Sequence, residues 1–215
     1  RYRASNAPYQ REIQDSFSDP KVRKIVLMMS AQVGKTNSLV NMIAYMIDQC
    51  PNNSLIVAPT LELGEAIIAE KIEPVIDASP LLQDLTCGRR DKGGHRSKRK
   101  IQYEGGLLSV SGTKNASNLR MRSTRYLLCD EVDEFAFEIK GQGDPLELAI
   151  KRTVTFPTAK IVLASTPTLK DYSRIEREFE LTDQRVWEAK CVHCGEFNEI
   201  VFEDIDLEAK CWHCP

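Results

Sequence analysis

The sequence lacks long hydrophobic runs and has no strong excess of charge. No apolar stretch approaches the roughly 18 residues that a membrane-spanning helix requires, and the chain opens Arg1-Tyr2-Arg3-Ala4 without the apolar core of a signal peptide. The net charge is −2, so a contact with nucleic acid would depend on local patches. An initiator methionine is also missing, and we expect a fragment of a longer protein that lies outside membranes.

The sequence does contain apolar segments that alternate with helical patterns. Buried strands are predicted at 24–29, 54–58, 126–129 and 161–164, and helices at 36–49, 61–78 and 145–154. Pro74 is expected to bend or end the second helix, and 100–111 is expected to form a hairpin. Near-continuous apolar strands separated by helices predict an α/β fold, with a mostly parallel sheet flanked by helices on both faces.

A phosphate-binding loop is predicted between the first strand and the first helix. It consists of Ser30, Ala31, Gln32, Val33, Gly34, Lys35 and Thr36. Backbone N–H groups and the positive end of a helix suit a phosphate at such a place. Gly34 would allow close approach, Lys35 would reach the β- and γ-phosphates, and the Thr36 hydroxyl would bind Mg²⁺. Met29 replaces the usual first glycine of this motif, and the alternative is an ordinary helix cap with a solvated lysine.

Two acidic residues follow the apolar strand at 126–129. ATP hydrolysis needs one acid to hold Mg²⁺ and one base to orient the attacking water. We assign Asp130 to the first role and Glu131 to the second. The alternative is a strand that ends in a solvated acidic turn. Asp133 and Glu134 extend the run, which is similar to the DExD pattern of helicases. We interpret both either as residues that support the catalytic acids or as structural residues.

Two further places are candidates for contact with a nucleotide. Ser165 and Thr166 follow the strand at 161–164 and would sense the γ-phosphate, unless they only form a hydroxyl-rich turn. Tyr9 and Gln10 precede the first strand. They would hold adenine by stacking and by an amide hydrogen bond, and the alternative is that they serve only packing and surface.

Cationic residues suggest two more roles. Arg120, Arg122 and Arg125 precede the acidic pair, and one of them is expected to neutralise charge in the transition state. We take Arg120 and Arg122 as the candidates. The sequence does not choose among the three arginines, and it does not decide whether the arginine acts on its own subunit or on a neighbouring one. The segment 89–100 has seven Lys or Arg and one Asp. It would neutralise DNA phosphates without reading bases, or it is a solvated loop.

Four cysteines form two close pairs near the end of the sequence. Cys191-x-x-Cys194 and Cys211-x-x-Cys214 are separated by sixteen residues. This spacing is typical of a zinc ribbon, in which four thiolates bind one structural Zn²⁺. The histidines inside the two pairs are weaker candidates.

The pattern of the chain changes near residue 185. After this point only short strand-like segments and the cysteine pairs follow. We therefore predict a P-loop ATPase domain at 1–184 and a zinc-ribbon-like segment at 185–215, which the end of the sequence cuts short.

In their order, these motifs resemble those of the large subunit of lambda-type phage terminases. The similar elements are Tyr9-Gln10-Arg11-Glu12, 27–36, Ala58-Pro59-Thr60, Gly105-Gly106, Ser111-Gly112, 118–123, Asp130-Glu131-Val132-Asp133, Ser165-Thr166-Pro167 and the cysteine pairs. They cover nearly the whole chain. That family tolerates serine in place of a glycine-rich start of the loop, so Met29 weighs less against it.

The resemblance implies a P-loop NTPase of the ASCE, RecA-like class that uses ATP with Mg²⁺ to package viral DNA. It implies double-stranded DNA, a terminase small subunit and the portal of a procapsid as partners. It also implies a homo-oligomeric ring that works in the cytoplasm of the bacterial host. A C-terminal metal-dependent endonuclease would lie beyond residue 215, so we expect no DNA cleavage by these residues alone.

Two other functions remain as alternatives. A DExD-type helicase would need a second RecA-like domain, for which 215 residues leave no room. A DNA-binding zinc module with a nucleotide fold that no longer hydrolyses would not need Lys35, Thr36, Asp130 and Glu131, all of which are present.

Overall fold

The structure is a computed structural model, and it describes residues 4–86, 96–114, 119, 122–139, 141–209 and 211–214. The chain divides into two compact units, Arg1–Phe179 and Glu180–Pro215, and each is described by itself. Within the described ranges, no helix has both the length and the apolar character needed to cross a membrane.

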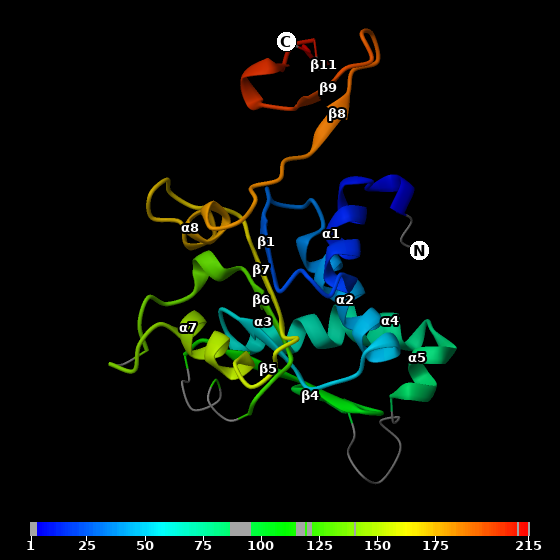
Figure 1. Ribbon diagram of the computed structural model, residues 1–215, viewed down its shortest axis with the longest axis vertical. Coiled ribbons are helices and arrows are strands. Elements are labelled where there is room, and N and C mark those ends of the chain that lie inside the picture. Colours follow the sequence, from blue (N-terminus) through cyan, green and yellow to red (C-terminus); the bar gives the residue numbers. More distant parts are fainter. Residues whose placement is uncertain are drawn as a thin grey trace. The chain divides into compact units, whose positions relative to one another are not determined.

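One sheet forms the centre of the first unit, with the strand order β1-β7-β6-β2-β5-β4-β3 in the described chain (Figure 1). Its strands are β1 (Lys24–Met28), β2 (Ser54–Ala58), β3 (Arg96–Ser97), β4 (Lys100–Tyr103), β5 (Gly106–Gly112), β6 (Tyr126–Asp130) and β7 (Lys160–Ser165). Strands β1, β7, β6, β2 and β5 run parallel, whereas β4 and β3 extend the sheet antiparallel beyond β5. The mostly parallel sheet and the hairpin that the sequence predicts are therefore confirmed.

Helices cover both faces of this sheet. They are η1 (Ala4–Asn6), α1 (Tyr9–Ser18), α2 (Lys35–Gln49), α3 (Leu61–Ala66), the π-helix η2 (Ile67–Ile72), α4 (Glu73–Asp77), α5 (Pro80–Leu85), η3 (Val132–Glu134), α7 (Pro145–Ile150), η4 (Lys151–Thr153) and α8 (Arg174–Glu180). One apolar core contains residues of α1, α2, η2, α4 and α5, and the other contains residues of η3, α7 and α8 (Figure 1). Neighbouring residues of β6 show the alternation, because Leu128 belongs to the first core and Leu127 to the second.

The helix predicted at 61–78 continues past its proline. The chain adopts π geometry over η2, and Pro74 then lies in the first turn of α4, which extends to Asp77. In a regular α-helix a proline lacks the N–H group and clashes with the carbonyl four residues earlier. We expected Pro74 to bend or end the helix, and the second of these is wrong, because the chain takes π geometry just before Pro74 and stays helical to Asp77. Helices α1, α5 and α8 are short and were not predicted.

The register of the sheet brings three strand ends together. Met28 at the end of β1 pairs with Ser165 at the end of β7, and Asp130 at the end of β6 pairs with Ala164. Loops that follow parallel strands meet at the carboxyl edge of the sheet, which is the usual place for a ligand in such folds. The predicted phosphate loop, acidic pair and hydroxyl pair therefore share one edge.

The second unit contains only short elements. They are β8 (Glu188–Lys190), β9 (Phe197–Glu199), η5 (Phe202–Asp204), β10 (Ile205–Asp206) and β11 (Cys211–Trp212). Strand β8 pairs antiparallel with β9, and β10 pairs antiparallel with β11. Among the described residues of this unit only Cys191 is buried. Apolar burial within the unit is therefore too small to stabilise it by itself.

Candidate active site

The loop between β1 and α2 depends on a glycine just before the helix. Gly34 caps α2 with a φ of 88°, in the left-handed region that glycine enters without steric cost. A Cβ atom at this position would lie 2.2 Å from Nε2 of Gln10. Only glycine therefore fits both the backbone conformation and the space that the Gln10 side chain occupies.

Lys35 is buried at the centre of the site, with 6% of its surface exposed. Its ammonium group donates hydrogen bonds to the Ser30 carbonyl at 3.0 Å and to Thr166 Oγ1 at 2.6 Å. The same nitrogen lies 3.8 Å from Oε1 of Glu131. One lysine thus joins the loop after β1, the acidic pair after β6 and the hydroxyl pair after β7.

Thr36 and Asp130 form an oxygen-rich pair beside this lysine. Thr36 Oγ1 donates to Asp130 Oδ2 at 3.0 Å. Asp130 is 5% exposed, and its other oxygen, Oδ1, is buried without a hydrogen-bond partner among the described residues. A threonine hydroxyl and a carboxylate with a free oxygen are ligands that suit Mg²⁺. Burial raises the pKa of Asp130 to about 6, with a smaller contribution from the Glu131 charge, and a bound cation would favour the ionised form.

Glu131 is held in an uncommon backbone conformation at the end of β6. Its φ is 52°, a left-handed value that costs a non-glycine residue roughly 1–2 kcal/mol. Oε2 of Glu131 accepts hydrogen bonds from the Ser165 hydroxyl and from the Thr166 N–H, both at 3.3 Å. The carboxylate is therefore aimed at the end of β7 by the backbone and held there by two donors.

The predicted adenine pair contacts the phosphate loop itself. Nε2 of Gln10 donates to the Val33 carbonyl at 2.9 Å, and the Tyr9 hydroxyl donates to the same oxygen at 3.0 Å. Gln10 is 3% exposed, and its Oε1 is buried without a hydrogen-bond partner in the described part of the chain. The amide nitrogen of Gln10 thus binds the loop, and its oxygen is left as a hydrogen-bond acceptor.

Asp133 holds the turn after Glu131 in place, which is the kind of supporting role that the sequence analysis gave it. Its carboxylate accepts hydrogen bonds from the Ile175 N–H at 2.7 Å and from the N–H and hydroxyl of Thr168 at 3.0 and 2.9 Å. Burial alone would raise the pKa of Asp133, but these donors outweigh burial and lower it below the usual value. The Asp133 N–H in turn donates to Ser165 Oγ at 3.2 Å, so this turn is tied to the donor that holds Glu131.

Arg174 is a residue that sequence reasoning missed. It begins α8, is 5% exposed, and donates to the carbonyls of Val132, Phe135 and Ala136 at 3.1, 3.3 and 3.2 Å. Asp144 lies 3.4 Å from the same guanidinium group. The segment after the acidic pair is thereby fixed to α8. One of two arginines in a highly charged helix gives no sequence signal for such a role.

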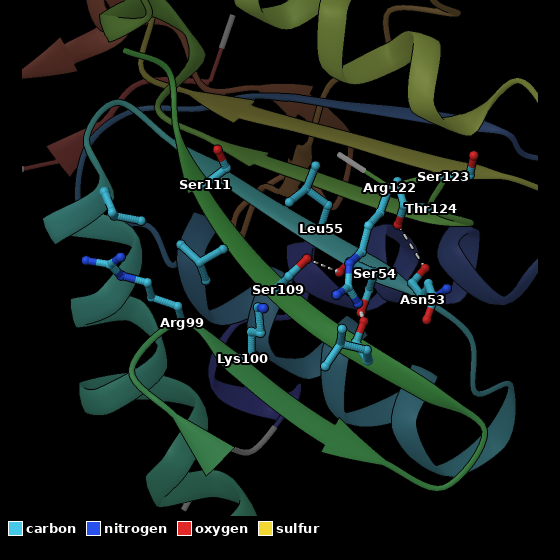
Figure 2. Close-up of a pocket in the computed structure, with 13 residues that line it drawn as sticks. Asn53, Ser54, Leu55, Arg99, Lys100, Ser109, Ser111, Arg122, Ser123 and Thr124 are labelled. Atoms are coloured by element: carbon cyan, nitrogen blue, oxygen red, sulfur yellow. Dashed lines mark hydrogen bonds between the residues drawn. The ribbon is translucent and has the colours of Figure 1, made fainter. Parts of the chain in front are cut away.

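The two candidate arginines that the structure describes, Arg122 and Arg125, do not lie at this site within one chain. Arg122 lines a cavity with Asn53 and Thr124, at the amino ends of β2 and β6 (Figure 2), whereas the phosphate loop lies at the carboxyl ends. About 13 Å of strand separates the two ends of β6. Arg125 stacks on the Tyr126 ring at 5.1 Å, and Arg120 lies outside the described residues. An action of Arg122 on the loop of its own chain is therefore not supported.

The cysteine pairs come together only in part. The sulfur atoms of Cys191, Cys194 and Cys214 lie within 4.8 Å of one another. The His193 N–H donates to Cys191 Sγ at 3.4 Å, as in the tight turns that hold metal-binding thiolates. Cys211 falls outside this group and lies instead with Asp206 and His213. The structure thus brings together three of the four cysteines that the sequence predicts as zinc ligands.

Comparisons with known proteins show which family and fold the chain resembles. The family model described as "Phage terminase large subunit gpA, ATPase domain" matches residues 1–214. The terminase large subunits of Enterobacteria phage P21 and Escherichia phage lambda are each 28% identical to the chain over 200 residues, which is 92% of this chain and 31% of each relative. The chain therefore spans less than a third of the length of these relatives.

Among solved structures, the chain is similar to a variant of the large terminase ATPase domain of Thermus phage P74-26. The TM-score is 0.55 at 17% identity, over 88% of this chain and 76% of that chain. It is also similar to the large terminase of a thermophilic bacteriophage in complex with ATP-γ-S, with a TM-score of 0.53 at 12% identity over 75% of this chain and 38% of that chain. At these identities the likeness concerns the fold alone.

Proposed function

The chain belongs to the family of phage terminase large subunit gpA ATPase domains, and from this membership we propose that it hydrolyses ATP to drive double-stranded DNA into a procapsid. The observation that carries the proposal is the convergence of Lys35 and Thr36 with Asp130 and Glu131 at one edge of the sheet. A cation, a metal-binding pair and a carboxylate base are the groups that phosphoryl transfer to water requires.

The proposed roles follow from the contacts of each side chain. Thr36 Oγ1 and the free oxygen of Asp130 would hold Mg²⁺. When bound, that ion neutralises charge on the β- and γ-phosphates. Lys35 would exchange its contacts with the loop carbonyls for phosphate oxygens. Glu131, already oriented by two donors, would polarise the attacking water.

Ser165 and Thr166 would change their hydrogen bonds according to whether a γ-phosphate is bound. Thr166 Oγ1 accepts from Lys35 while the Thr166 N–H donates to Glu131. A shift of Lys35 onto a γ-phosphate would therefore change the hydrogen bonds at the end of β7. Gln10 would accept from the adenine amino group through its unpartnered oxygen, and Tyr9 would contribute ring contact.

The assembly that we propose places several chains in a ring. Because Arg122 lies away from the phosphate loop of its own chain, we propose that Arg122, or Arg120 close to it, acts on the nucleotide of a neighbouring subunit. The terminase small subunit and the portal of the procapsid would be partners in the host cytoplasm. An endonuclease would belong to the remainder of a full-length protein, since the chain covers only part of its relatives.

The C-terminal segment at 185–215 is proposed to bind one structural Zn²⁺. Three thiols lie close together, and the described residues of this segment bury almost no apolar side chain. Both observations support the proposal, because a unit with little core needs a metal or another cross-link. Cys211 as the fourth ligand remains a prediction from the spacing of the pairs.

Steady-state hydrolysis and nucleotide binding by two variants test the proposal. Glu131→Gln should bind Mg-ATP within a few-fold of the wild type and lower turnover by roughly 10²–10⁴-fold. Lys35→Ala should lose both binding and turnover while the circular dichroism spectrum stays unchanged. Glu134→Gln removes the same charge from an exposed neighbour and should behave like the wild type. Normal turnover in Glu131→Gln would remove the glutamate from catalysis.

A further inference from the structure

The last hairpin of the second unit brings an aspartate, a cysteine and a histidine to one face. Strand β10 pairs antiparallel with β11, and Asp206 stands directly opposite Cys211 in the register. Side chains opposite each other in such a pair point to the same face, with Cβ atoms about 5 Å apart. The His213 N–H donates to the Asp204 carbonyl at 2.8 Å, so the same pairing continues past the end of β11.

This register separates Cys211 from Cys214. Side chains alternate between the two faces of an extended strand, so His213 shares the face of Cys211, whereas a residue three positions after Cys211 belongs to the other face. Cys214 accordingly lies with Cys191 and Cys194, and Nδ2 of Asn198 donates to its Sγ at 3.8 Å. The extended backbone thus explains why Cys211 stands apart from the other three thiols.

The distances between the three side chains suit one tetrahedral ion. Nε2 of His213 lies 3.6 Å from Sγ of Cys211 and 3.8 Å from Oδ2 of Asp206, and the three atoms lie within 4.8 Å of one another. A zinc ion bound about 2.3 Å from a sulfur and about 2.1 Å from a nitrogen holds these two atoms about 3.6 Å apart. The carboxylate oxygen would need to approach the imidazole by only roughly 0.4 Å.

The turn between the two strands orients the carboxylate. Oδ1 of Asp206 accepts hydrogen bonds from the N–H groups of Glu208 and Ala209, at 2.9 and 2.8 Å. Oδ2 of the same carboxylate is the oxygen that lies toward His213. Donors that fix one oxygen of a carboxylate while the other faces the ion are a common support of metal ligands.

The types of ligand atom indicate which ion would bind. A thiolate, an imidazole and a carboxylate are the ligands that zinc takes in proteins, whereas Mg²⁺ and Ca²⁺ take oxygen ligands. Cys211 and His213 are exposed and Asp206 is half-buried, so water would complete the coordination. A site with one thiolate should bind zinc more weakly than a site with three.

We propose that Asp206, Cys211 and His213 bind a second divalent transition-metal ion of the zinc type, separate from the ion held by the other three thiols. The inference rests on the proposed function in one respect, since the first zinc keeps this unit folded. It competes with the prediction, made from the spacing of the pairs, that Cys211 is the fourth ligand of the first ion. The chain should carry one tightly bound zinc, and the second site should fill when metal is added.

Titration of the zinc-loaded chain with Co²⁺ tests this inference, with zinc measured on the same samples after dialysis. Cobalt bound to a thiolate shows a charge-transfer absorption band, which a cobalt ion at the oxygen ligands of Thr36 and Asp130 would lack. The wild type should keep its zinc and bind one Co²⁺ with this band. His213→Ala should weaken the binding of Co²⁺ at least about tenfold and keep the zinc, which also shows that the unit remains folded.

A matched control removes the histidine of the other cysteine pair. His193→Ala should change neither the zinc content nor the binding of Co²⁺, because only the backbone N–H of His193 contacts a thiol in the described chain. Equal losses of Co²⁺ binding in His193→Ala and His213→Ala would overturn the inference.

Cys211→Ser decides between the two assignments of this thiol. The inference expects this variant to keep the tightly bound zinc and to lose the cobalt charge-transfer band. Loss of the zinc in Cys211→Ser, with normal zinc in His213→Ala, would make Cys211 the fourth ligand of the first ion and overturn the inference.

The same measurements separate this inference from the proposed zinc site. A wild-type chain that holds one zinc but shows no cobalt band would refute the second site and leave the first intact. A wild-type chain without tightly bound zinc that still binds a Co²⁺ sensitive to His213→Ala would refute the proposed zinc site instead.

Discussion

Replacing Asp130 by asparagine should change how the stability of the protein depends on pH. Asp130 is 5% exposed and lacks a partner for one carboxylate oxygen, so the folded state disfavours its charge. The pKa of this group is about 6 in the folded protein, against an ordinary value of 3.8. Asparagine keeps the size of the side chain and an acceptor for the Thr36 hydroxyl, but it has no charge to bury.

The magnitude follows from the pKa difference. About 2 pKa units at 1.36 kcal/mol each correspond to about 3 kcal/mol. Because the folded pKa lies above the unfolded one, the wild type has this stability below about pH 4 and loses it as the pH rises through about 6. The asparagine variant has no such loss. Its advantage in the free energy of unfolding should grow by about 1.4 kcal/mol per pH unit between these limits and then stay constant.

Urea unfolding of both proteins between about pH 4 and pH 8, in EDTA and without nucleotide, measures this difference. An unpaired amide in the variant shifts the whole curve by a constant and leaves its slope unchanged. Asp133→Asn is the matched control with the opposite sign. The pKa of Asp133 is lowered by its donors, so there the wild type should be favoured at neutral pH and lose that advantage in acid. A difference between wild type and Asp130→Asn that does not vary with pH would refute the argument from burial.

The remaining predictions concern the loop, the arginine of α8 and the metal. Gly34→Ala should lower the free energy of unfolding by roughly 1–2 kcal/mol and weaken nucleotide binding in a titration; unchanged affinity would contradict the packing argument. Arg174→Met should lower kcat for ATP at least about tenfold with little change in KM, because the turn that orients Glu131 loses its support. Arg174→Lys should recover part of kcat. A fall in kcat together with a rise in KM of the same size would indicate a merely structural role. Metal analysis of the folded chain should find about one zinc per molecule, and Cys194→Ser should abolish it; a native second unit without metal would exclude the site.

Much of the site could be predicted because its parts stand at strand ends. Apolar runs mark the strands. Asp130 and Ser165 are the last residues of β6 and β7, and Lys35 follows the short loop after β1. In a parallel sheet, carboxyl ends share one edge, so the order of elements already brings these residues close together. The adenine pair was assigned on weaker grounds, and the structure adds that Gln10 braces the loop at Gly34.

Other features could not be read from local patterns. Arg122 stands at the amino end of β6 because it precedes this strand in the sequence, but its place beside β2 and β5 depends on strand pairing, which is non-local. The separation of Cys211 from the other three thiols depends on how two short hairpins fold. Arg174 gains its importance only because α8 packs beside the turn after Glu131.

The sequence by itself determined the alternation of strands and helices, the loop that begins α2 and the acids that end β6, because these depend on backbone periodicity and on neighbours along the chain. The tertiary structure decided which side chains are desolvated, which donors orient Glu131, and on which face of the β10–β11 hairpin Cys211 lies. These properties arise from sheet register and from packing between segments distant in sequence, and no local pattern specifies them.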